Sequence, residues 1–489
     1  MKQDVAKPSS SPAGRPRWLG PSIILSLAVA SLAVAAMFPV KRESGVRFWT
    51  FARLHHEMYV PLSQEWNKQH PDEPLRVSLF GVQAMEQRLL SSFMSGVVSA
   101  ELLEVERPMS SRAFAGPLES VGFTDLTQLV ERDNLRSKIH PAAFKPWTMQ
   151  GHIFGIPHDL HPVMLGYRAD IVEAAGIDVS RIETWDDFVR VLSPLLYDAN
   201  GNRRNDRHLL NIWETHATTF EMLAMQAGGG LVNEQGLPTL DHPANARVLA
   251  QVAEWITDKE RVAGDAPYFT ASGNQLLLDG FVLASFVPDW MCNVWRKEIP
   301  QLGGKVKLMP LPAWDKGGRR TSVWGGTMLG ISRDAPNQDR LWEIAKHLYL
   351  SKEVATRLYK EGDIVTPVRE YWSDPMYDQP DPYFRDQKRG RMYINLADQV
   401  PDRFNSPFAQ MAQVRFQSAA SELVAYARSQ GKTKRDELLA KAKELVAQAQ
   451  ADVMLHVNRN RFYAERAKAS KSAAEPVNDA QGTSDGGAR

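Results

Sequence analysis

The chain has 489 residues, 43% hydrophobic and 24% charged, which is enough to bury a large core and form two or three domains. Its 58 Lys and Arg residues nearly balance 57 Asp and Glu residues, so the net charge of +1 does not favour nucleic acid as a partner. The single cysteine, Cys292, excludes an internal disulfide, a cysteine-rich zinc site and a lipid-modified N-terminal cysteine.

The N-terminal segment predicts export. Residues 1–17 contain four basic side chains, and residues 18–38 contain no ionisable one. As a helix, the apolar segment would span roughly 31 Å, about the thickness of a bilayer core, and the preceding basic residues orient the remaining chain outside the cytoplasm. We expect a cytoplasmic n-region at 1–17 and a signal or transmembrane helix at 18–38 that tethers a periplasmic or other extracytoplasmic protein to the membrane. Cleavage after the small residues at 34–36 and a buried core helix are the alternatives.

Strands and helices alternate after this segment. The predicted strands are 46–51, 75–80 and 101–106. The helix between the first two strands has Tyr59, Leu62 and Trp66 on its apolar face, and a second helix covers 84–94. Alternation at this spacing is typical of βαβ units on a parallel sheet, so the sequence predicts an α/β fold.

The stretch 151–168 organises the middle of the chain. Pro157 and Pro162 restrict the residues before them to extended conformations, which predicts a strand, a bend and a second strand. The bend contains His158, Asp159 and His161. Polar groups at this position predict both a hinge between two sheets and a ligand site.

The later part of the chain is richer in helices. Thr184 begins one of them, and Asp187 completes a capping box. Further helices are predicted at 220–226, 246–256, 341–350 and 433–468, and further strands at 281–287, 305–309 and 328–331. Residues 469–489 are small and polar, and we expect them to be disordered.

The histidines raise the possibility of a metal site. His158, Asp159 and His161 are potential ligands, and the segment 55–57, which reads His-His-Glu, offers more. Adjacent residues of a strand point to opposite faces, however, and no second clustered set completes a tetrahedral site. We therefore assign no metal and no cofactor, and expect these side chains to form hydrogen bonds to a ligand or within the hinge.

Carboxylates near the ends of predicted strands and helices are compatible with acid–base catalysis, as in a glycosidase. A glycosidase needs only two carboxylates roughly 5 to 9.5 Å apart, which sequence spacing does not exclude. The sequence has no G-x-S-x-G, Walker A or Rossmann glycine motif, so it does not support a serine hydrolase, an NTPase or a dinucleotide-binding enzyme.

Tryptophans adjacent to carboxylates indicate a sugar ligand. Trp213 precedes Glu214, and Asp289 precedes Trp290. A pyranose has apolar C–H faces and equatorial hydroxyls, so an aromatic face beside a hydrogen-bond acceptor suits it. The pairs together favour carbohydrate binding.

From about Val46 to Val457 the chain resembles the extracellular solute-binding protein family 1, the sugar-capturing subunits of bacterial ABC importers. The stretches that carry the resemblance are VRFWTF, EWNKQHPD, ELLEVE, GHIFGIPHDLHPVMLGYR, ETWDDF, DGFVLASFVPDW, WGGTMLGIS and VTPVR, in this order. The resemblance implies a two-lobed periplasmic-binding-protein fold with a ligand cleft between the lobes and closure by hinge bending. It implies a first lobe at 46–159 plus 310–361 and a second at 160–309 plus 362–468, with crossings near 159–162, 309–312 and 362–366.

The resemblance also implies a function. It predicts a monomeric, non-catalytic protein that captures a sugar or oligosaccharide for ABC permease subunits. An extracytoplasmic carbohydrate-active enzyme and a ligand-sensing subunit are the alternatives, and the sequence does not name the ligand. The positions that match the family's sugar contacts are Trp49, Glu106, Asp159, His161, Glu214, Asp289, Trp290, Trp324, Gly325, Gly326 and Arg369. Trp213 and Arg53 are added from the residue patterns alone.

Overall fold

The computed structural model describes residues 19–37, 44–198, 201, 205–465 and 467. The chain divides into a unit that ends at Gly45 and a unit that begins at Val46. The first unit contains helix α1 (Leu19–Met37), so the chain is helical where the sequence predicted a helix. Within the described residues, no helix has both the length and the apolar character needed to cross a membrane. The n-region at 1–17 and the tail at 469–489 lie outside the described residues.

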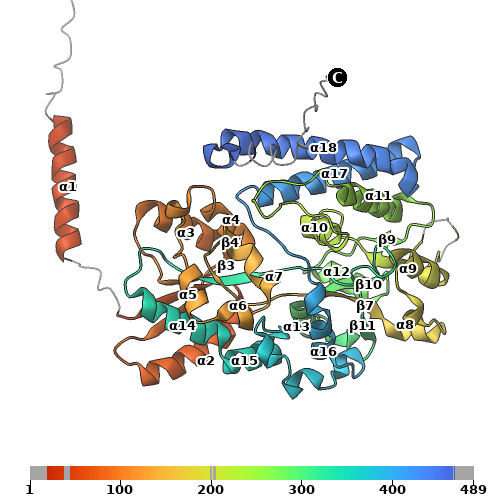
Figure 1. Ribbon diagram of the computed structural model, residues 1–489, viewed down its shortest axis with the longest axis horizontal. Helices are drawn as coiled ribbons and strands as arrows, with labels where there is room; N and C mark the ends of the chain where they lie inside the picture. The colour runs from red at the N-terminus through yellow and green to blue at the C-terminus, as the bar shows by residue number, and fades with distance from the viewer. Residues whose placement is uncertain (1–18, 38–43, 199–200, 202–204, 466, 468–489) are drawn as a thin grey trace, which may run out of the picture. The chain divides into compact units, whose positions relative to one another are not determined.

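The second unit is built on two five-stranded sheets, each the centre of one lobe (Figure 1). The first sheet has the order β2-β1-β3-β12-β6. Its strands are β1 (Val46–Thr50), β2 (Leu75–Leu79), β3 (Leu102–Glu106), β6 (Ile156–Pro157) and β12 (Thr327–Ile331). Strand β1 is parallel to β2 and β3, which confirms the predicted βαβ units, and β12 returns antiparallel to β3 and β6. The sheet is therefore mixed, because the chain passes through the second lobe before it returns.

The helices of the first lobe follow the predicted alternation. They are α2 (Arg53–Gln69), α3 (Val82–Ser95), α4 (Arg107–Ala113), α5 (Thr127–Arg132), α6 (Leu135–Lys138), α7 (Pro141–Phe144), α14 (Gln338–Leu350) and α15 (Lys352–Gly362), with a short hairpin of β4 (Thr148–Met149) and β5 (His152–Ile153). Tyr59 and Leu62 on the predicted apolar face of α2 are buried with Phe48 of β1 in one hydrophobic cluster. Burial of such large apolar side chains drives the association of helix and sheet.

The second sheet has the order β11-β7-β10-β8-β9. Its strands are β7 (Val163–Arg168), β8 (His208–Asn211), β9 (Ala263–Gly264), β10 (Val282–Pro288) and β11 (Val306–Pro310). Every residue of β10 is buried, since it pairs with β7 on one side and β8 on the other. The sequence analysis did not predict β8, a four-residue strand too short for a clear period.

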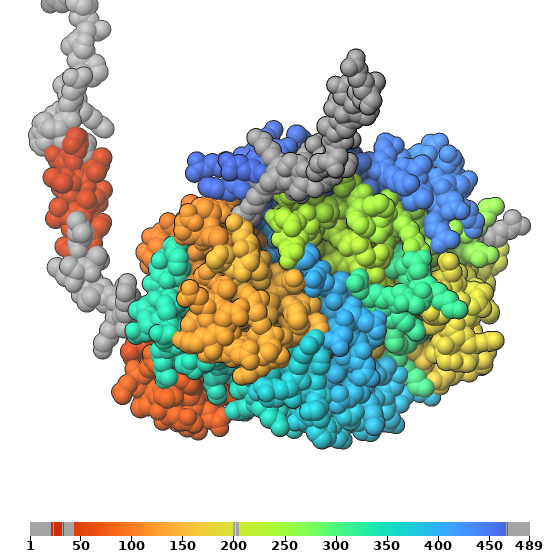
Figure 2. Space-filling view, viewed as in Figure 1, coloured from red at the N-terminus to blue at the C-terminus, as the bar shows by residue number. Residues whose placement is uncertain are grey.

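The helices of the second lobe are α8 (Ala169–Ala174), α9 (Trp185–Leu192), α10 (Ala217–Gln226), α11 (Pro243–Thr257), α12 (Ala271–Leu278), α13 (Asp289–Glu298), α16 (Arg389–Leu396), α17 (Ala409–Gln430) and α18 (Arg435–Arg459). The predicted capping box of Thr184 and Asp187 opens α9. Helix α17 was not predicted, because alanines supply most of its buried face and its hydrophobic periodicity is weak. Helices α17 and α18 lie along α10 and α11 at one side of the lobe (Figures 1 and 2).

Three segments connect the lobes. The first, 158–162, joins β6 to β7, and the second returns beside it, since Val163 N donates to Ser322 O at 3.2 Å and Pro162 pairs with Val323. The residues just after β11 still contact the second lobe, where Ala313 N donates to Glu183 O at 2.8 Å. The chain therefore crosses nearer to Val323 than to the predicted 309–312. The third segment follows α15 at 363–368.

Candidate ligand-binding site

A cavity of about 580 Å³, which we call the ligand cavity, lies between the two lobes. The first lobe contributes the start of α2 and Glu106, and the second lobe contributes Phe269 and one face of α13. His161 and residues 324–326 come from the crossing segments, and Thr327 is the first residue of β12. The cavity is lined by Phe51, Ala52, Arg53, Leu54, His55, Glu57, Glu106, His161, Phe269, Trp290, Asn293, Val294, Lys297, Glu298, Trp324, Gly325, Gly326, Thr327 and Ile364.

Aromatic rings form one wall of this cavity. Phe269 and Trp290 are stacked, with ring centroids 6.0 Å apart and planes 15° from parallel. Trp324 meets Trp290 edge to face at 5.9 Å, and Trp290 Nε1 donates to Trp324 O at 2.9 Å. This hydrogen bond fixes the orientation of Trp290, so its indole ring is held in place at the cavity wall.

A second row of rings supports Trp324 from behind. Tyr268 contacts it edge to face at 5.1 Å, and His216 lies 5.3 Å away. Trp213 stacks on His216 at 4.5 Å with nearly parallel planes, and it does not line the cavity. Burial lowers the pKa of His216 to about 4, so this imidazole is neutral at physiological pH. Trp213 therefore acts through His216 to position Trp324.

Two glycines let the crossing segment approach the ring wall closely. Gly325 and Gly326 have φ values of 115° and 124°, a region that other residues rarely adopt. A Cβ atom on Gly325 would lie 2.6 Å from His161 Cδ2 and 3.0 Å from Trp290 Nε1. A side chain at this position would displace both neighbours, so the glycine is a steric requirement of the site.

Glu106 places a carboxylate at the first-lobe side of the cavity. It is the last residue of β3 and stands opposite Thr327 of β12. Burial raises the pKa of Glu106, while His55 and Arg403 act in the opposite direction. A carboxyl group at this point offers hydrogen bonds to a ligand hydroxyl in either protonation state.

His161 connects the cavity to two buried carboxylates. Its Nδ1 lies 2.6 Å from Asp289 Oδ1, and its Nε2 lies 3.0 Å from Asp159 Oδ2. Burial alone would lower the pKa of His161, but the carboxylates of Asp159 and Asp289 raise it to about 10. His161 is therefore a cation held between two anions, and its backbone φ of 51° marks the sharp bend between β6 and β7.

The same network links two crossing segments. Asp289 begins α13 and is fully buried, and its Oδ2 accepts from Val365 N at 2.8 Å on the third crossing. Asp159 and His161 belong to the first crossing. Asp159 and Asp289 thus lie behind the cavity wall and fix the hinge segments, and neither lines the cavity.

Three of the sequence-predicted residues lie away from the cavity. Trp49 is buried in β1 with its ring 4.6 Å from Phe80. Glu214 lies 3.7 Å from both Arg261 and Arg428 in ion pairs. Arg369 is exposed and donates to Asp398 at 2.9 Å. The structure brings together at the cavity Glu106, His161, Trp290, Trp324, Gly325 and Gly326, together with Arg53.

Other lining residues were not anticipated as ligand contacts. Phe269 is 49% exposed and has a φ of 61°, so the backbone there holds an aromatic ring toward solvent. Its signal in the sequence is the Tyr268–Phe269 pair directly before Thr270, the capping residue of α12. The sequence marks His55 and Glu57 only as potential metal ligands. The face of α13 with Asn293, Lys297 and Glu298 has no local signal that separates it from an ordinary exposed surface.

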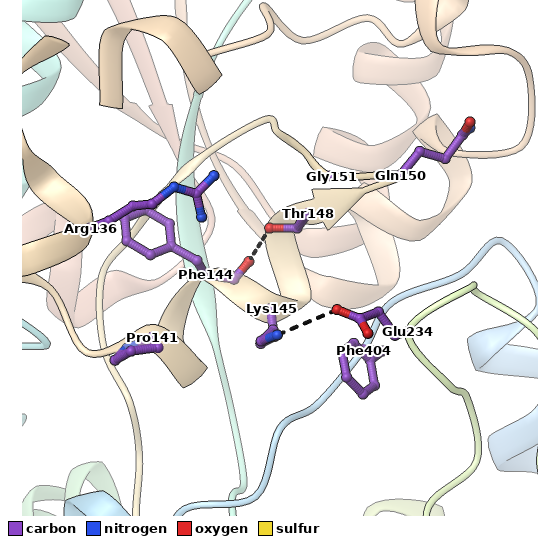
Figure 3. Close-up of a pocket in the computed structure, with 9 residues that line it drawn as sticks. All are labelled: Arg136, Pro141, Phe144, Lys145, Thr148, Gln150, Gly151, Glu234 and Phe404. Carbon is purple, nitrogen blue, oxygen red and sulfur yellow. Dashed lines mark hydrogen bonds and ion pairs between the residues drawn. The ribbon is translucent and has the colours of Figure 1, made fainter. Parts of the chain in front are cut away.

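A second cavity, of about 340 Å³, also has walls from both lobes (Figure 3). Its walls include Lys145 and Thr148 from the first lobe and Glu234 and Phe404 from the second. The Lys145 ammonium lies 3.6 Å from the Glu234 carboxylate and 5.5 Å from the centre of the Phe404 ring. We call it the Lys145 cavity.

Two lobes, adjacent crossings and a cavity between them define the class of two-lobed α/β binding proteins. The family model described as bacterial extracellular solute-binding protein matches residues 55–355. The chain belongs to this family. It is 25% identical over 327 residues to an arabinooligosaccharide-binding protein of Bacillus subtilis, an alignment that covers 66% of this chain and 72% of the relative.

Solved structures show the same fold. The sugar-binding protein MalE of Xanthomonas citri superimposes with a TM-score of 0.66 at 16% identity, covering 84% of this chain and 98% of MalE. A binding protein of B. animalis subsp. lactis, solved with β-1,6-galactobiose, has a TM-score of 0.61 at 14% identity, covering 86% and 98%.

Proposed function

We propose that this protein captures a sugar or oligosaccharide outside the cytoplasm and delivers it to ABC permease subunits, without catalysis and as a monomer. The observation that supports this most is the wall of Phe269, Trp290 and Trp324 beside Glu106 in a cavity between two lobes. Flat apolar faces with adjacent hydrogen-bonding groups suit a pyranose or furanose ring. The arabinooligosaccharide-binding relative and the galactobiose-bound neighbour support the same class of ligand.

We assign roles to five of the lining residues. The ring faces of Trp290 and Phe269 stack on the sugar, and Glu106 accepts from a hydroxyl group. Arg53 and Lys297 donate from the two lobes, so a ligand that contacts both holds the lobes together. Closure on the ligand then occurs by bending at the crossing segments.

A buried ion cluster beside the cavity favours contact between the lobes. Arg107 of the first lobe donates to both oxygens of Glu221 in α10, at 3.0 and 2.9 Å. Arg403 donates to Glu221 at 2.6 Å and to Gly325 O at 2.9 Å. Opening the lobes at this point would separate buried charges, which costs more than separating exposed ones.

We also propose that the protein is located at the cytoplasmic membrane. Members of the family are extracellular by its description, and residues 18–38 lack ionisable side chains. We propose that this segment directs export and retains the chain at the cytoplasmic membrane. Fractionation of cells that express the full-length chain tests this, since the protein is expected in the membrane fraction at its full mass. A shorter, freely released form would contradict tethering.

Thermal unfolding of the purified chain against a panel of mono- and oligosaccharides tests the function. A ligand that binds only the folded state stabilises it by RT ln(1 + [L]/Kd), about 2.7 kcal/mol at a hundredfold excess over Kd. We expect a raised Tm with one class of sugar and recovery of that sugar intact. Recovery of cleaved sugar would indicate an enzyme, and the absence of any shift would contradict sugar capture.

A further inference from the structure

Two imidazoles and one carboxylate meet in the first lobe behind the wall of the cavity. They are His55 of α2, Glu104 of β3 and His158 of the first crossing, and all three are buried. One donor atom from each lies within 4.8 Å of the other two. The sequence separates these residues by about fifty positions each, so no local motif announces the group.

One nitrogen in this group is left without a partner. His158 is fully buried, and its Nδ1 lies 3.2 Å from Asp159 Oδ2. Its Nε2 is also buried and has no hydrogen-bond partner among the described residues. An unpaired buried polar atom is unfavourable, and each such atom in a folded protein calls for an explanation.

The hydrogen bonding of His158 suits a metal ligand. The Asp159 carboxylate lies 3.2 Å from Nδ1 and accepts a hydrogen bond from it, which leaves the lone pair of the imidazole on the buried, unpartnered Nε2. A carboxylate on the opposite nitrogen is the usual support of a metal-binding histidine.

Hydrogen bonds from neighbouring side chains also fix the orientation of the Glu104 carboxylate. Its Oε1 accepts from Thr50 Oγ1 at 2.5 Å, and its Oε2 accepts from Tyr349 OH at 2.6 Å. His55 Nδ1 lies 2.9 Å from Glu104 Oε1, so a cation at this place would replace the proton that the two now share. His55 also lines the ligand cavity, which gives a cation a route to the group.

We propose that His55, Glu104 and His158 bind a divalent transition metal of the zinc class. Two imidazoles and one carboxylate are a donor set that Zn²⁺ takes at about 2.0–2.2 Å, with a water molecule in the fourth position. The three donor atoms lie within 4.8 Å of one another, so their side chains would rearrange locally to reach these distances. The bound ion would join α2 and β3 to the first crossing, and so stiffen the segment at which the lobes bend.

Zinc binding to the full-length chain, with any affinity tag removed, tests the proposal. We expect the chelator-treated protein to take up one Zn²⁺ per chain in equilibrium dialysis, with a raised Tm. Replacement of a supporting residue of a metal site typically lowers affinity 10–100-fold, so loss of a ligand in His158→Gln is expected to weaken binding by about 100-fold or more. The control is His152→Gln, because His152 is an exposed histidine of the same lobe that pairs with Asp125.

X-ray absorption on the zinc-loaded wild-type chain gives a readout that needs no variant. Two imidazoles and one carboxylate oxygen around zinc would support the proposal, even if His158→Gln fails to fold. Absence of stoichiometric zinc, a single imidazole around the metal, or unchanged affinity in a folded His158→Gln would overturn it. Sugar binding by the metal-free chain is measured separately, so either proposal can fail alone.

Discussion

The ligand cavity and the Lys145 cavity both take walls from the two lobes, yet they differ in what those walls offer. In the ligand cavity, Trp290 presents a fixed ring face and Phe269 is half exposed. In the Lys145 cavity, the charged groups neutralise one another, since the Lys145 ammonium pairs with the Glu234 carboxylate and lies over the Phe404 ring (Figure 3). We therefore place the proposed sugar site in the ligand cavity, where apolar faces and polar atoms are held by other residues and left uncovered.

A substitution in the buried network behind the ligand cavity should cause the largest loss of stability. His161→Ala removes the shared partner of Asp159 and Asp289, which leaves two buried carboxylates without their cation. We expect a loss of about 3–5 kcal/mol in the free energy of unfolding, measured by urea denaturation. The matched control, His152→Ala, removes an exposed histidine–carboxylate pair and should cost less than about 1 kcal/mol. Equal losses in the two variants would contradict the distinction between the networks.

The contribution of His161 to the free energy of unfolding should also depend on pH. Its pKa is raised to about 10 in the folded chain from about 6.5 in the unfolded chain, so its stabilisation is fully present below about pH 6.5 and lost as pH approaches 10. Asp159 has a lowered pKa, so its contribution is present above about pH 4 and lost below that value. The difference in unfolding free energy between wild type and His161→Ala should therefore be largest between these limits. A difference that stays constant from about pH 6 to pH 10 would show that His161 is not a buried cation.

Trp290→Ala tests the ring wall itself. Loss of a large apolar face should weaken sugar binding by about 1.5–3 kcal/mol. This corresponds to roughly a 10- to 150-fold rise in Kd, measured by calorimetry. Trp66→Ala is the control, because Trp66 is a partly buried tryptophan on α2 that does not line the cavity. Unchanged affinity in Trp290→Ala would remove Trp290 from the site.

Phe269→Ala should have a smaller effect on the same measurement. Phe269 is 49% exposed and adds a smaller ring beside Trp290, so we expect its loss to weaken sugar binding by less than the roughly 1.5–3 kcal/mol expected for Trp290→Ala. Tyr197→Ala removes another exposed aromatic ring of the second lobe, outside the cavity, and should leave affinity unchanged. If both variants bind the sugar like wild type, Phe269 does not contact it.

Lys145→Ala should have the smallest effect. The ion pair with Glu234 is partly exposed and spans 3.6 Å, so its removal should change the free energy of unfolding by less than about 1 kcal/mol. Sugar affinity should stay at the wild-type value, because Lys145 does not line the ligand cavity. A large loss of sugar affinity would reverse the assignment of the two cavities.

The elements with strong local signals could be predicted from the sequence. The strand–bend–strand at 151–168, the capping box at Thr184 and the parallel strands β1 to β3 all follow from proline, capping and apolar patterns. Helix α17 could not be predicted, because its buried face consists mostly of alanines. The crossing near Val323 could not be predicted either, because its position depends on pairing with Pro162, more than 150 residues earlier.

Part of the candidate site could be predicted from the sequence. The structure places the predicted glycines at 325 and 326 and the predicted Asp289–Trp290 pair at the cavity or directly behind it. Trp49 and Glu214 share the same residue types, but core packing and surface ion pairs hold them elsewhere. Which of several tryptophans faces a ligand depends on contacts between distant segments, which spacing along the chain does not contain.

The most direct measurement of the central claim is a crystal structure of the chain with the sugar that raises its Tm. The account predicts a sugar ring stacked on Trp290 or Phe269, with a hydroxyl group hydrogen-bonded to Glu106. A sugar in the Lys145 cavity, or a sugar that contacts none of these three residues, would contradict it.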